Sequence, residues 1–158
     1  MRIGQGIDVH AFQDGGRLVL GGVTVPHDRS LEAHSDGDVV LHALCDALLG
    51  AAGLGDIGRH FPPNDADYED IDSRILLRRS YEQVTKAGYA LINADITVVA
   101  QAPRLSPFID AMCSTISMDL QVNHSQVNIK ATTTEQLGFT GRGEGIAAFA
   151  VVLLDSRS

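Results

Sequence analysis

The sequence predicts an α+β fold, a two-layer sandwich in which one sheet packs against helices. Two strand–helix–strand passages follow one another along the chain, close to a ferredoxin-like plan. The pair Gly21–Gly22 between two short apolar runs indicates an extra hairpin. Residues 146–154 are almost all apolar, which predicts a strand at the centre of the sheet.

The chain opens with a predicted strand over residues 2–10. Side chains alternate between the two faces of a strand, so three aliphatic residues share one side: Ile3, Ile7 and Val9. The hairpin follows, with strands over residues 17–20 and 23–25 and the glycine pair as its turn.

A helix is predicted over residues 36–49. Ser35 is placed to cap it, with Asp38 three residues later as in a capping box, and Gly50 ends it. Residues 51–72 are rich in Gly, Pro and Asp and predict a long loop. Long loops in compact domains are often functional.

A second helix is predicted to begin at Asp72 or Ser73 and to reach Ala87, where Gly88 ends it. Its apolar face contains Leu77, Tyr81 and Val84. A strand over residues 91–100 follows and closes the first strand–helix–strand passage.

The second passage begins with a helix at Ser106–Pro107, because proline is favoured in the first turn. Four apolar residues of this helix are expected to face inward: Phe108, Ile109, Met112 and Ile116. Strands over residues 126–131 and 146–154 complete the sheet, and residues after about 154 are expected to form a flexible tail.

The composition indicates a single domain over residues 1–158, with 44% hydrophobic residues available for a core. The net charge of −8 disfavours nucleic-acid binding, because nucleic-acid-binding proteins present basic surfaces. The sequence shows no membrane span and no targeting segment, so a cytoplasmic protein is expected. Cys45 and Cys113 are expected to be buried and reduced.

The pattern Asp8-Val9-His10 is the strongest indication of chemistry. Asp8 and His10 share a face of the predicted strand, and a carboxylate and an imidazole so placed can chelate a metal ion. Alone, His42 on an apolar helix is typical of a core histidine held by hydrogen bonds. Together the three residues supply three ligands, which leaves one tetrahedral position open as in catalytic zinc sites.

Asp38, His42 and Asp46 are spaced four residues apart and share a helix face. We therefore expect a carboxylate of this helix to orient the second ring nitrogen of His42. His34 and Ser35 stand at the helix start, which favours an anion, although Ser35 can equally be a simple cap. Three further histidines are interpreted as surface or loop residues: His27, His60 and His124.

Several motifs occur in order along the chain: Gly6–His10, Ala33–Asp38 with His42, Gly55–Gly58, Ala100–Pro103, Lys130–Glu135 and Gly138–Gly145. They closely resemble the 2-C-methyl-D-erythritol 2,4-cyclodiphosphate synthase family. That family converts 4-diphosphocytidyl-2-C-methyl-D-erythritol 2-phosphate into the cyclic diphosphate and CMP in the non-mevalonate isoprenoid pathway. The substrate's own 2-phosphate attacks its β-phosphorus, so the resemblance implies a lyase that folds the substrate and shields its charge.

The resemblance also implies roles for single residues. Asp8, His10 and His42 would bind zinc, which acts as a Lewis acid at the β-phosphate. Glu135 would bind a magnesium or manganese ion between the α- and β-phosphates. The catalytic residues that stabilise the transition state would be His34 and Thr133.

A larger set is implied to contact the substrate: Asp8, His10, His34, Ser35, Asp56, Ile57, Gly58, Phe61, Asp65, Ala100, Pro103, Arg104, Leu105, Ser106, Ala131, Thr132, Thr133, Thr134, Glu135, Phe139 and Arg142. Residues from 56 to 65 would meet the ribose or the erythritol portion. Those of the 100–106 segment, with Ala131 and Thr132, would form the cytosine and phosphate pocket.

The family assembles as a homotrimer with active sites between subunits, so the resemblance implies zinc and cytidine pockets from different chains. Pro63 stands where an acidic residue is common, and Asp65 is expected to serve instead. Arg104 stands where lysine is common and forks around a phosphate. Some relatives hold an isoprenoid diphosphate on the trimer axis, which makes Phe139 and Arg142 candidates for that site or ordinary loop residues.

Two other functions fit the residues. The first is a zinc-dependent phosphodiesterase or nucleotidase that uses bound water as the nucleophile. The second is a non-catalytic trimeric scaffold in which the metal is structural, although the incomplete ligand set argues against it.

Overall fold

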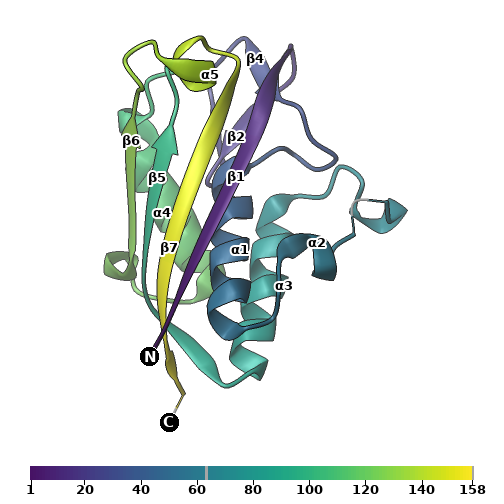
Figure 1. Ribbon diagram of the computed structural model, residues 1–158, viewed down its shortest axis with the longest axis vertical. Helices are drawn as coiled ribbons and strands as arrows, with labels where there is room; N and C mark the ends of the chain where they lie inside the picture. Colours follow the sequence, from purple (N-terminus) through teal and green to yellow (C-terminus); the bar gives the residue numbers. More distant parts are fainter. Residues whose placement is uncertain (63, 158) are drawn as a thin grey trace.

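The computed structural model describes residues 1–62 and 64–157 and consists of a sheet with helices on one face (Figure 1). The strands of the main sheet are β1 (Arg2–Asp14), β4 (Arg29–Leu31), β5 (Tyr89–Val99), β6 (Val127–Thr132) and β7 (Gly145–Ser156). The helices are α1 (Val39–Ala52), α2 (Ile57–His60), α3 (Ser73–Lys86), α4 (Ile109–Leu120) and α5 (Gly138–Gly141). Short 3₁₀ helices cover Ala66–Tyr68, Ser106–Phe108 and His124–Gln126.

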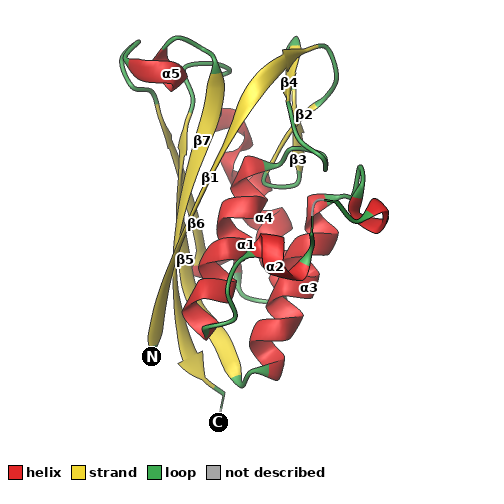
Figure 2. Ribbon diagram, turned by 45° about the vertical axis from the view of Figure 1, so that its right-hand side comes forward, coloured by secondary structure: helices red, strands yellow, loops and turns green. Residues whose placement is uncertain are grey.

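The sheet is mixed and has the strand order β4-β1-β7-β5-β6. β7 lies between β1 and β5 and pairs antiparallel with both, so the prediction of a central last strand is confirmed. Figure 2 shows α1, α3 and α4 together on one side of the sheet. The predicted two-layer α+β arrangement is therefore correct.

The ferredoxin-like plan is wrong in its connectivity. That plan runs β-α-β-β-α-β, with two successive strands between its helices. Here α4 joins β5 directly to β6, and these two strands are parallel. β7 then returns antiparallel between β1 and β5. Hydrophobic patterns identify the type of each element, but they do not encode the order of strands in the sheet.

The hairpin is confirmed as β2 (Leu18–Leu20) and β3 (Val23–Val25), which form a separate two-stranded sheet. Gly21 and Gly22 have φ angles of 58° and 75°, the positive values that the tightest hairpin turns require. β4 was not predicted. It pairs with the end of β1, which continues four residues beyond the predicted limit to Asp14.

The first helix begins later than predicted, because Asp38 is its cap. The side chain of Asp38 accepts a hydrogen bond from the backbone N–H of Leu41, so the predicted role of Ser35 as the cap is wrong. Gly50 lies inside α1, which continues to Ala52 and ends at Gly53 in the left-handed conformation. A glycine can end a helix only where the chain turns away, and at Gly50 the helix still packs on the sheet.

The predicted long loop over residues 51–72 contains α2 and a 3₁₀ helix. Pro63, where the sequence departs from the family pattern, lies outside the described residues. α3 is confirmed with Asp72 as its cap. The prediction of inward residues holds for Leu77, Val84, Met112 and Ile116, which are buried, while Tyr81, Phe108 and Ile109 are partly buried.

β1 and α1 are in unusually close contact. A Cβ atom on Gly6 would lie 2.0 Å from the carbonyl oxygen of Ala43, and one on Gly4 would lie 2.0 Å from that of Ala47. The two glycines therefore allow the helix backbone to rest on the strand. Because residues alternate along a strand, Asp8 and His10 share the face of these glycines and point toward α1.

The β1–β7 part of the opposite sheet face is apolar and uncovered in this chain, whereas its β5–β6 part is polar. Ile3, Ile7 and Val9 share it as predicted, yet they are 74%, 52% and 46% exposed. Phe149 and Val151 of the neighbouring β7 are also among the exposed large hydrophobic residues. Such a continuous apolar face is typical of a surface that another protein chain covers.

β7 extends to Ser156, two residues beyond the point where the sequence predicted a tail. Cys45 and Cys113 are free and buried, as predicted. None of the helices in the described part of the chain combines the length and apolar character that crossing a membrane requires.

Candidate metal centre and substrate site

Asp8 and His10 of β1 meet His42 of α1 in one cluster, as the sequence predicted. Asp8 Oδ2 lies 2.7 Å from His10 Nε2 and 3.0 Å from His42 Nδ1. The two ring nitrogens lie 3.3 Å apart. Each residue offers one ligand atom, and all three atoms lie within 4.8 Å of one another.

These donors fit a divalent metal ion. Ligand atoms of a tetrahedral zinc with bonds of about 2.0 Å lie about 3.3 Å apart, which is the separation of the two imidazole nitrogens. Asp8 lies closer to both rings and would move outward by a few tenths of an ångström. One carboxylate and two imidazoles leave a tetrahedral position for a further ligand.

The tautomer of His10 is determined by its backbone partner. Its Nδ1 lies 2.8 Å from the carbonyl oxygen of Glu32, which can only accept a hydrogen bond. Nδ1 therefore carries the proton, and in the neutral ring the lone pair of Nε2 faces the cluster.

His42 faces the cluster with Nδ1. Its second ring nitrogen, Nε2, points away from the cluster and lies 2.9 Å from Ser73 Oγ and 3.2 Å from Ser35 Oγ. The expectation that a carboxylate of the same helix orients this nitrogen is wrong. Asp38 instead accepts from the backbone of Gly21, Gly22 and Leu41, and Asp46 accepts from the backbone of Ile57.

Burial and hydrogen bonding act in opposite directions on the cluster. Burial alone would raise the pKa of Asp8, but hydrogen bonds from His10 and His42 outweigh it and hold this pKa well below its usual range. Burial would likewise lower the pKa of His10, and the hydrogen bond and charge of Asp8 raise it. Asp8 is therefore ionised near neutral pH, the state in which a carboxylate binds a metal.

A cavity of about 250 Å³ adjoins the cluster. Its lining residues are His10, Ala33, His34, Ser35, His42, Ile57, Gly58, Phe61, Tyr68, Ile71 and Leu76. Sequence analysis missed Tyr68, Ile71 and Leu76. The first two lie in the segment read as loop, and Leu76 has the pattern of an ordinary core residue, so no local signal separates them from packing residues.

The predicted substrate residues around this cavity differ in exposure and role. The side chain of Asp56 caps α2 by accepting from Arg59 N at 2.8 Å. Phe61 packs edge-on against Tyr68, with ring centroids 5.4 Å apart. Asp65 caps the 3₁₀ helix 66–68 and accepts from Asp67 N at 3.0 Å, and it is not among the lining residues.

A second group of predicted residues lies at the ends of β5 and β6. These strands are parallel, so the segments that follow them leave the sheet at the same edge. Ala100 N donates to Thr132 O at 3.0 Å, and Gln136 N donates to Gln101 Oε1 at 3.1 Å. The 100–106 and 131–136 segments thus form one surface, as expected for a shared pocket.

Glu135 is exposed on this surface and has a positive φ of 52°. Its backbone N–H lies 3.2 Å from Thr133 Oγ1, which in turn donates to Glu135 Oε1 at 3.3 Å. Its carboxylate faces solvent, free of any cation partner among the described residues.

The members of the second group differ in what they can offer a ligand. Arg104 is exposed and donates to Ser106 Oγ at 2.9 Å. Leu105 is 3% exposed, so its side chain belongs to the core and only its backbone is available to a ligand. Ala131, Thr132 and Thr133 are exposed, while Ala100 is buried and Pro103 and Thr134 are half-buried.

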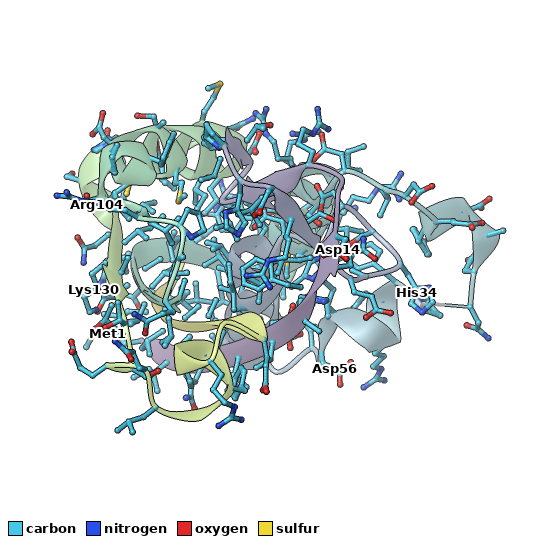
Figure 3. All side chains as sticks on the ribbon, turned by 90° about the horizontal axis from the view of Figure 1, so that it is seen from above. Met1, Asp14, His34, Asp56, Arg104 and Lys130 are labelled. Atoms are coloured by element: carbon cyan, nitrogen blue, oxygen red, sulfur yellow. The ribbon has the colours of Figure 1, made fainter. Side chains whose placement is uncertain are left out.

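The structure does not bring the two groups together within one chain. In Figure 3, Arg104 lies on one side of the molecule, and His34 and Asp56 lie on the other. The cavity beside the metal cluster contains none of the residues from 100 to 106 or from 131 to 135. Phe139 and Arg142 of the α5 region are absent from the lining of that cavity, and Arg142 is exposed and pairs with Glu144 at 3.0 Å.

The remaining histidines lie outside the cluster. His60 is in α2 and contacts Leu54 O at 2.8 Å. His27 lies between β3 and β4, and His124 begins the 3₁₀ helix 124–126. Their interpretation as surface or loop residues fits these positions.

Comparison with known proteins gives one consistent family. The YgbB family model matches residues 1–155. The curated 2-C-methyl-D-erythritol 2,4-cyclodiphosphate synthase of Cellvibrio japonicus is 62% identical over 157 residues and covers 99% of both chains. The structure of the bifunctional IspDF of Campylobacter jejuni is similar with a TM-score of 0.95 at 47% identity, over 98% of this chain and 42% of that chain. The CDP complex of Plasmodium falciparum IspF has a TM-score of 0.87 at 37% identity, over 99% of this chain and 97% of that chain.

Proposed function

Because the chain belongs to the YgbB family, it cyclises 4-diphosphocytidyl-2-C-methyl-D-erythritol 2-phosphate to 2-C-methyl-D-erythritol 2,4-cyclodiphosphate, and we propose how its residues do so. The substrate's 2-phosphate attacks its own β-phosphorus, the bond from that phosphorus to the α-phosphate oxygen breaks, and CMP leaves. The nucleophile belongs to the substrate. The protein therefore has to position the chain of phosphates and offset their charge.

Asp8, His10 and His42 hold zinc in this proposal. When bound, zinc supplies a Lewis acid to an oxygen of the β-phosphate. The cluster next to a cavity is the observation that carries the assignment, since three donors would leave one tetrahedral position for a further ligand. Glu135 would hold a magnesium or manganese ion that offsets the charge of the substrate's phosphates, and its exposed carboxylate supports that role.

The cavity beside the metal centre receives the erythritol portion in this proposal. Ile57 and Phe61 supply apolar walls. Asp56 and Asp65 are exposed residues outside the cavity lining, and in this proposal they contact the substrate from the same 56–65 segment. His34 donates to phosphoryl oxygens as charge builds there. Its position in the cavity lining, next to Ser35, supports this role.

The surface formed by residues 100–106 and 131–135 binds the cytidine and its phosphates in this proposal. Arg104, with Ser106 beside it, offers a cationic fork to phosphate. Thr133 donates to the transition state from the same surface. The CDP complex of the similar Plasmodium falciparum protein supports a cytidine nucleotide as the ligand class.

The active chain is a homotrimer in this proposal, one domain per subunit, with each site built from two subunits. Two observations support it. The metal cluster and the cytidine surface lie apart in one chain (Figure 3), and an apolar sheet face is left uncovered. An isoprenoid diphosphate on the trimer axis, near Phe139 and Arg142, remains a further prediction of the resemblance.

The test is product analysis. Purified protein with zinc, magnesium and the cytidyl substrate is expected to release CMP and an equal amount of cyclic diphosphate, identified by phosphorus NMR. A zinc-dependent hydrolase would release CMP with an open-chain phosphate instead. Release of CMP at the same rate by a His42→Ala variant would contradict the proposed metal centre.

A structural role for the metal is tested separately. Chelation is expected to abolish activity while the melting temperature changes little, because the core of α1 and the sheet is built without the metal. Unfolding on chelation would favour the scaffold function.

A further inference from the structure

Ser73 is the first residue of α3 and is completely buried. Its hydroxyl oxygen lies 2.9 Å from Nε2 of His42, the ring nitrogen that faces away from the metal cluster. A buried hydroxyl beside a ligand's second nitrogen is in the position from which outer partners orient metal-bound imidazoles.

Asp36 determines the direction in which this hydroxyl donates. Asp36 Oδ1 accepts from Ser73 Oγ and from Asp38 N, and Oδ2 accepts from Ser73 N at 3.0 Å. An ionised carboxylate can only accept, so the hydroxyl hydrogen of Ser73 points to Asp36. Ser73 Oγ must then accept from His42, and the proton of the neutral imidazole resides on Nε2.

In the neutral ring, the other nitrogen of His42, Nδ1, would then offer its lone pair to a metal ion bound with Asp8 and His10. The result is a chain of hydrogen bonds that runs from His42 Nε2–H to Ser73 Oγ–H to the Asp36 carboxylate. Neither Asp36 nor Ser73 touches the cluster itself, and both act through the ring they orient.

We propose that Asp36 and Ser73 are positioning residues that set the tautomer and orientation of His42 for metal binding. This inference rests on the proposed metal centre. It goes beyond that centre by assigning the orientation of His42 to two residues outside the cluster. Ser73 lies 31 positions after His42 in the sequence and 37 positions after Asp36.

The first experiment measures zinc affinity by competition with a chelator. Ser73→Ala is expected to lower the affinity by about 10- to 100-fold, the usual cost of losing an outer partner of a metal ligand. Ser80→Ala is the matched control, since Ser80 is equally buried on the same helix and makes no hydrogen bond to the cluster among the described residues. The control is expected to keep the wild-type affinity.

The second experiment follows the His42 ring by NMR of the zinc-bound protein. The Nε2–H proton of His42 is expected to exchange slowly with solvent in the wild type, where Ser73 Oγ accepts it, and faster in Ser73→Ala. Asp36→Asn is expected to act in the same direction, because a single amide oxygen cannot accept all three hydrogen bonds. This variant and the wild-type spectrum test the proposal even where Ser73→Ala fails to fold.

Three outcomes would overturn the proposal. One is a His42 Nε2–H proton that exchanges equally fast in wild type, Ser73→Ala and Asp36→Asn, and another is unchanged zinc affinity in both variants. The third is unchanged affinity in Asp8→Asn, which would refute the metal centre and the positioning role together. Loss of affinity in Asp8→Asn, with none in the other two variants, would refute the positioning role alone.

Discussion

At the scale of single residues, His10 and His42 face the candidate metal cluster with different ring nitrogens. His10 presents Nε2 because its Nδ1 donates to Glu32 O, and His42 presents Nδ1 because its Nε2 meets Ser73. The carboxylate of Asp8 lies between them. The geometry is thus determined by groups outside the cluster, and each of its ligands can be tested singly.

Asp8→Asn is expected to weaken zinc binding by at least about 10-fold, because a neutral amide replaces the charged ligand. Metal content after dialysis measures the effect. Asp14→Asn is the matched control, since Asp14 is an exposed carboxylate at the end of the same strand. Equal zinc content in wild type and Asp8→Asn would contradict the assignment of this ligand.

Glu135→Gln is expected to leave the zinc content unchanged and to raise the magnesium concentration needed for half-maximal activity by about 10-fold or more. The reason is that Glu135 lies on the β6 side, away from the zinc cluster, and its carboxylate is the charged group offered there. Activity titrated with magnesium measures the effect. An unchanged magnesium requirement would show that this carboxylate binds no metal.

At the scale of elements, the contact between β1 and α1 brings together the three residues of the candidate metal cluster. Gly4 and Gly6 remove the side chains that would hold the helix away from the strand. Asp38 then ties the start of α1 to the hairpin turn at Gly21 and Gly22. A shift of either contact would change the distance from His42 to Asp8.

Gly6→Ala is expected to lower the free energy of unfolding by about 1–3 kcal/mol, because its Cβ would meet the Ala43 carbonyl at 2.0 Å and the helix must move. Urea unfolding measures the change. Gly50→Ala is the matched control within α1, where a Cβ meets nothing within 4 Å. The free energy of unfolding of Gly50→Ala is expected to rise by about 0.5–1 kcal/mol. A decrease equal to that of Gly6→Ala would contradict the packing argument.

Asp38 is expected to make stability depend on pH. Burial, with the nearby charge of Asp36, raises the pKa of Asp38 from 3.8 to about 6 against the opposing backbone hydrogen bonds. At pH values between about 4 and about 6, Asp38 therefore binds a proton more tightly in the folded chain than in the unfolded chain. The protein's free energy of unfolding falls as pH rises from about 4 to about 6, by at most about 3 kcal/mol.

Urea unfolding of wild type and Asp38→Asn across this pH range isolates the effect of Asp38. The difference in free energy of unfolding between the two proteins is expected to change in that window alone. A difference that stays constant from pH 4 to pH 7 would show that the pKa of Asp38 is close to its usual value.

At the scale of the whole molecule, the chain has one covered and one uncovered face of its sheet. The helices cover the first face (Figure 2). On the second face, Ile3, Ile7 and Val9 are exposed. The two halves of the proposed site also lie apart. Assembly of several chains through the apolar face would account for both observations. It would bury that face and bring the metal cluster of one chain next to the cytidine surface of a neighbouring chain.

Ile7→Lys is expected to prevent the trimer from forming and to abolish activity, because a buried unpaired charge costs several kcal/mol. Light scattering during size-exclusion chromatography measures the mass, and circular dichroism checks that the chain still folds. Arg79→Ala, an exposed position of α3 in the helical layer, is the control and is expected to remain trimeric. A fully active monomer would contradict a site shared between subunits.

The sequence by itself determined the main helices and strands and the three residues of the candidate metal cluster. Local periodicity carries both, because the alternation of a strand puts Asp8 and His10 on one face whatever the strand pairs with. The glycine pair of the hairpin and the apolar run of β7 were equally readable. Each of these features depends on residues close together in the chain.

Only the tertiary structure decided what depends on distant residues. The strand order overturned the ferredoxin-like connectivity, and Asp38 proved to cap α1 and hold the hairpin turn. Ser73 joined Asp36 beside His42, where the sequence pointed to Asp38 or Asp46. These pairings form because the packed core selects one arrangement among many that the local patterns allow.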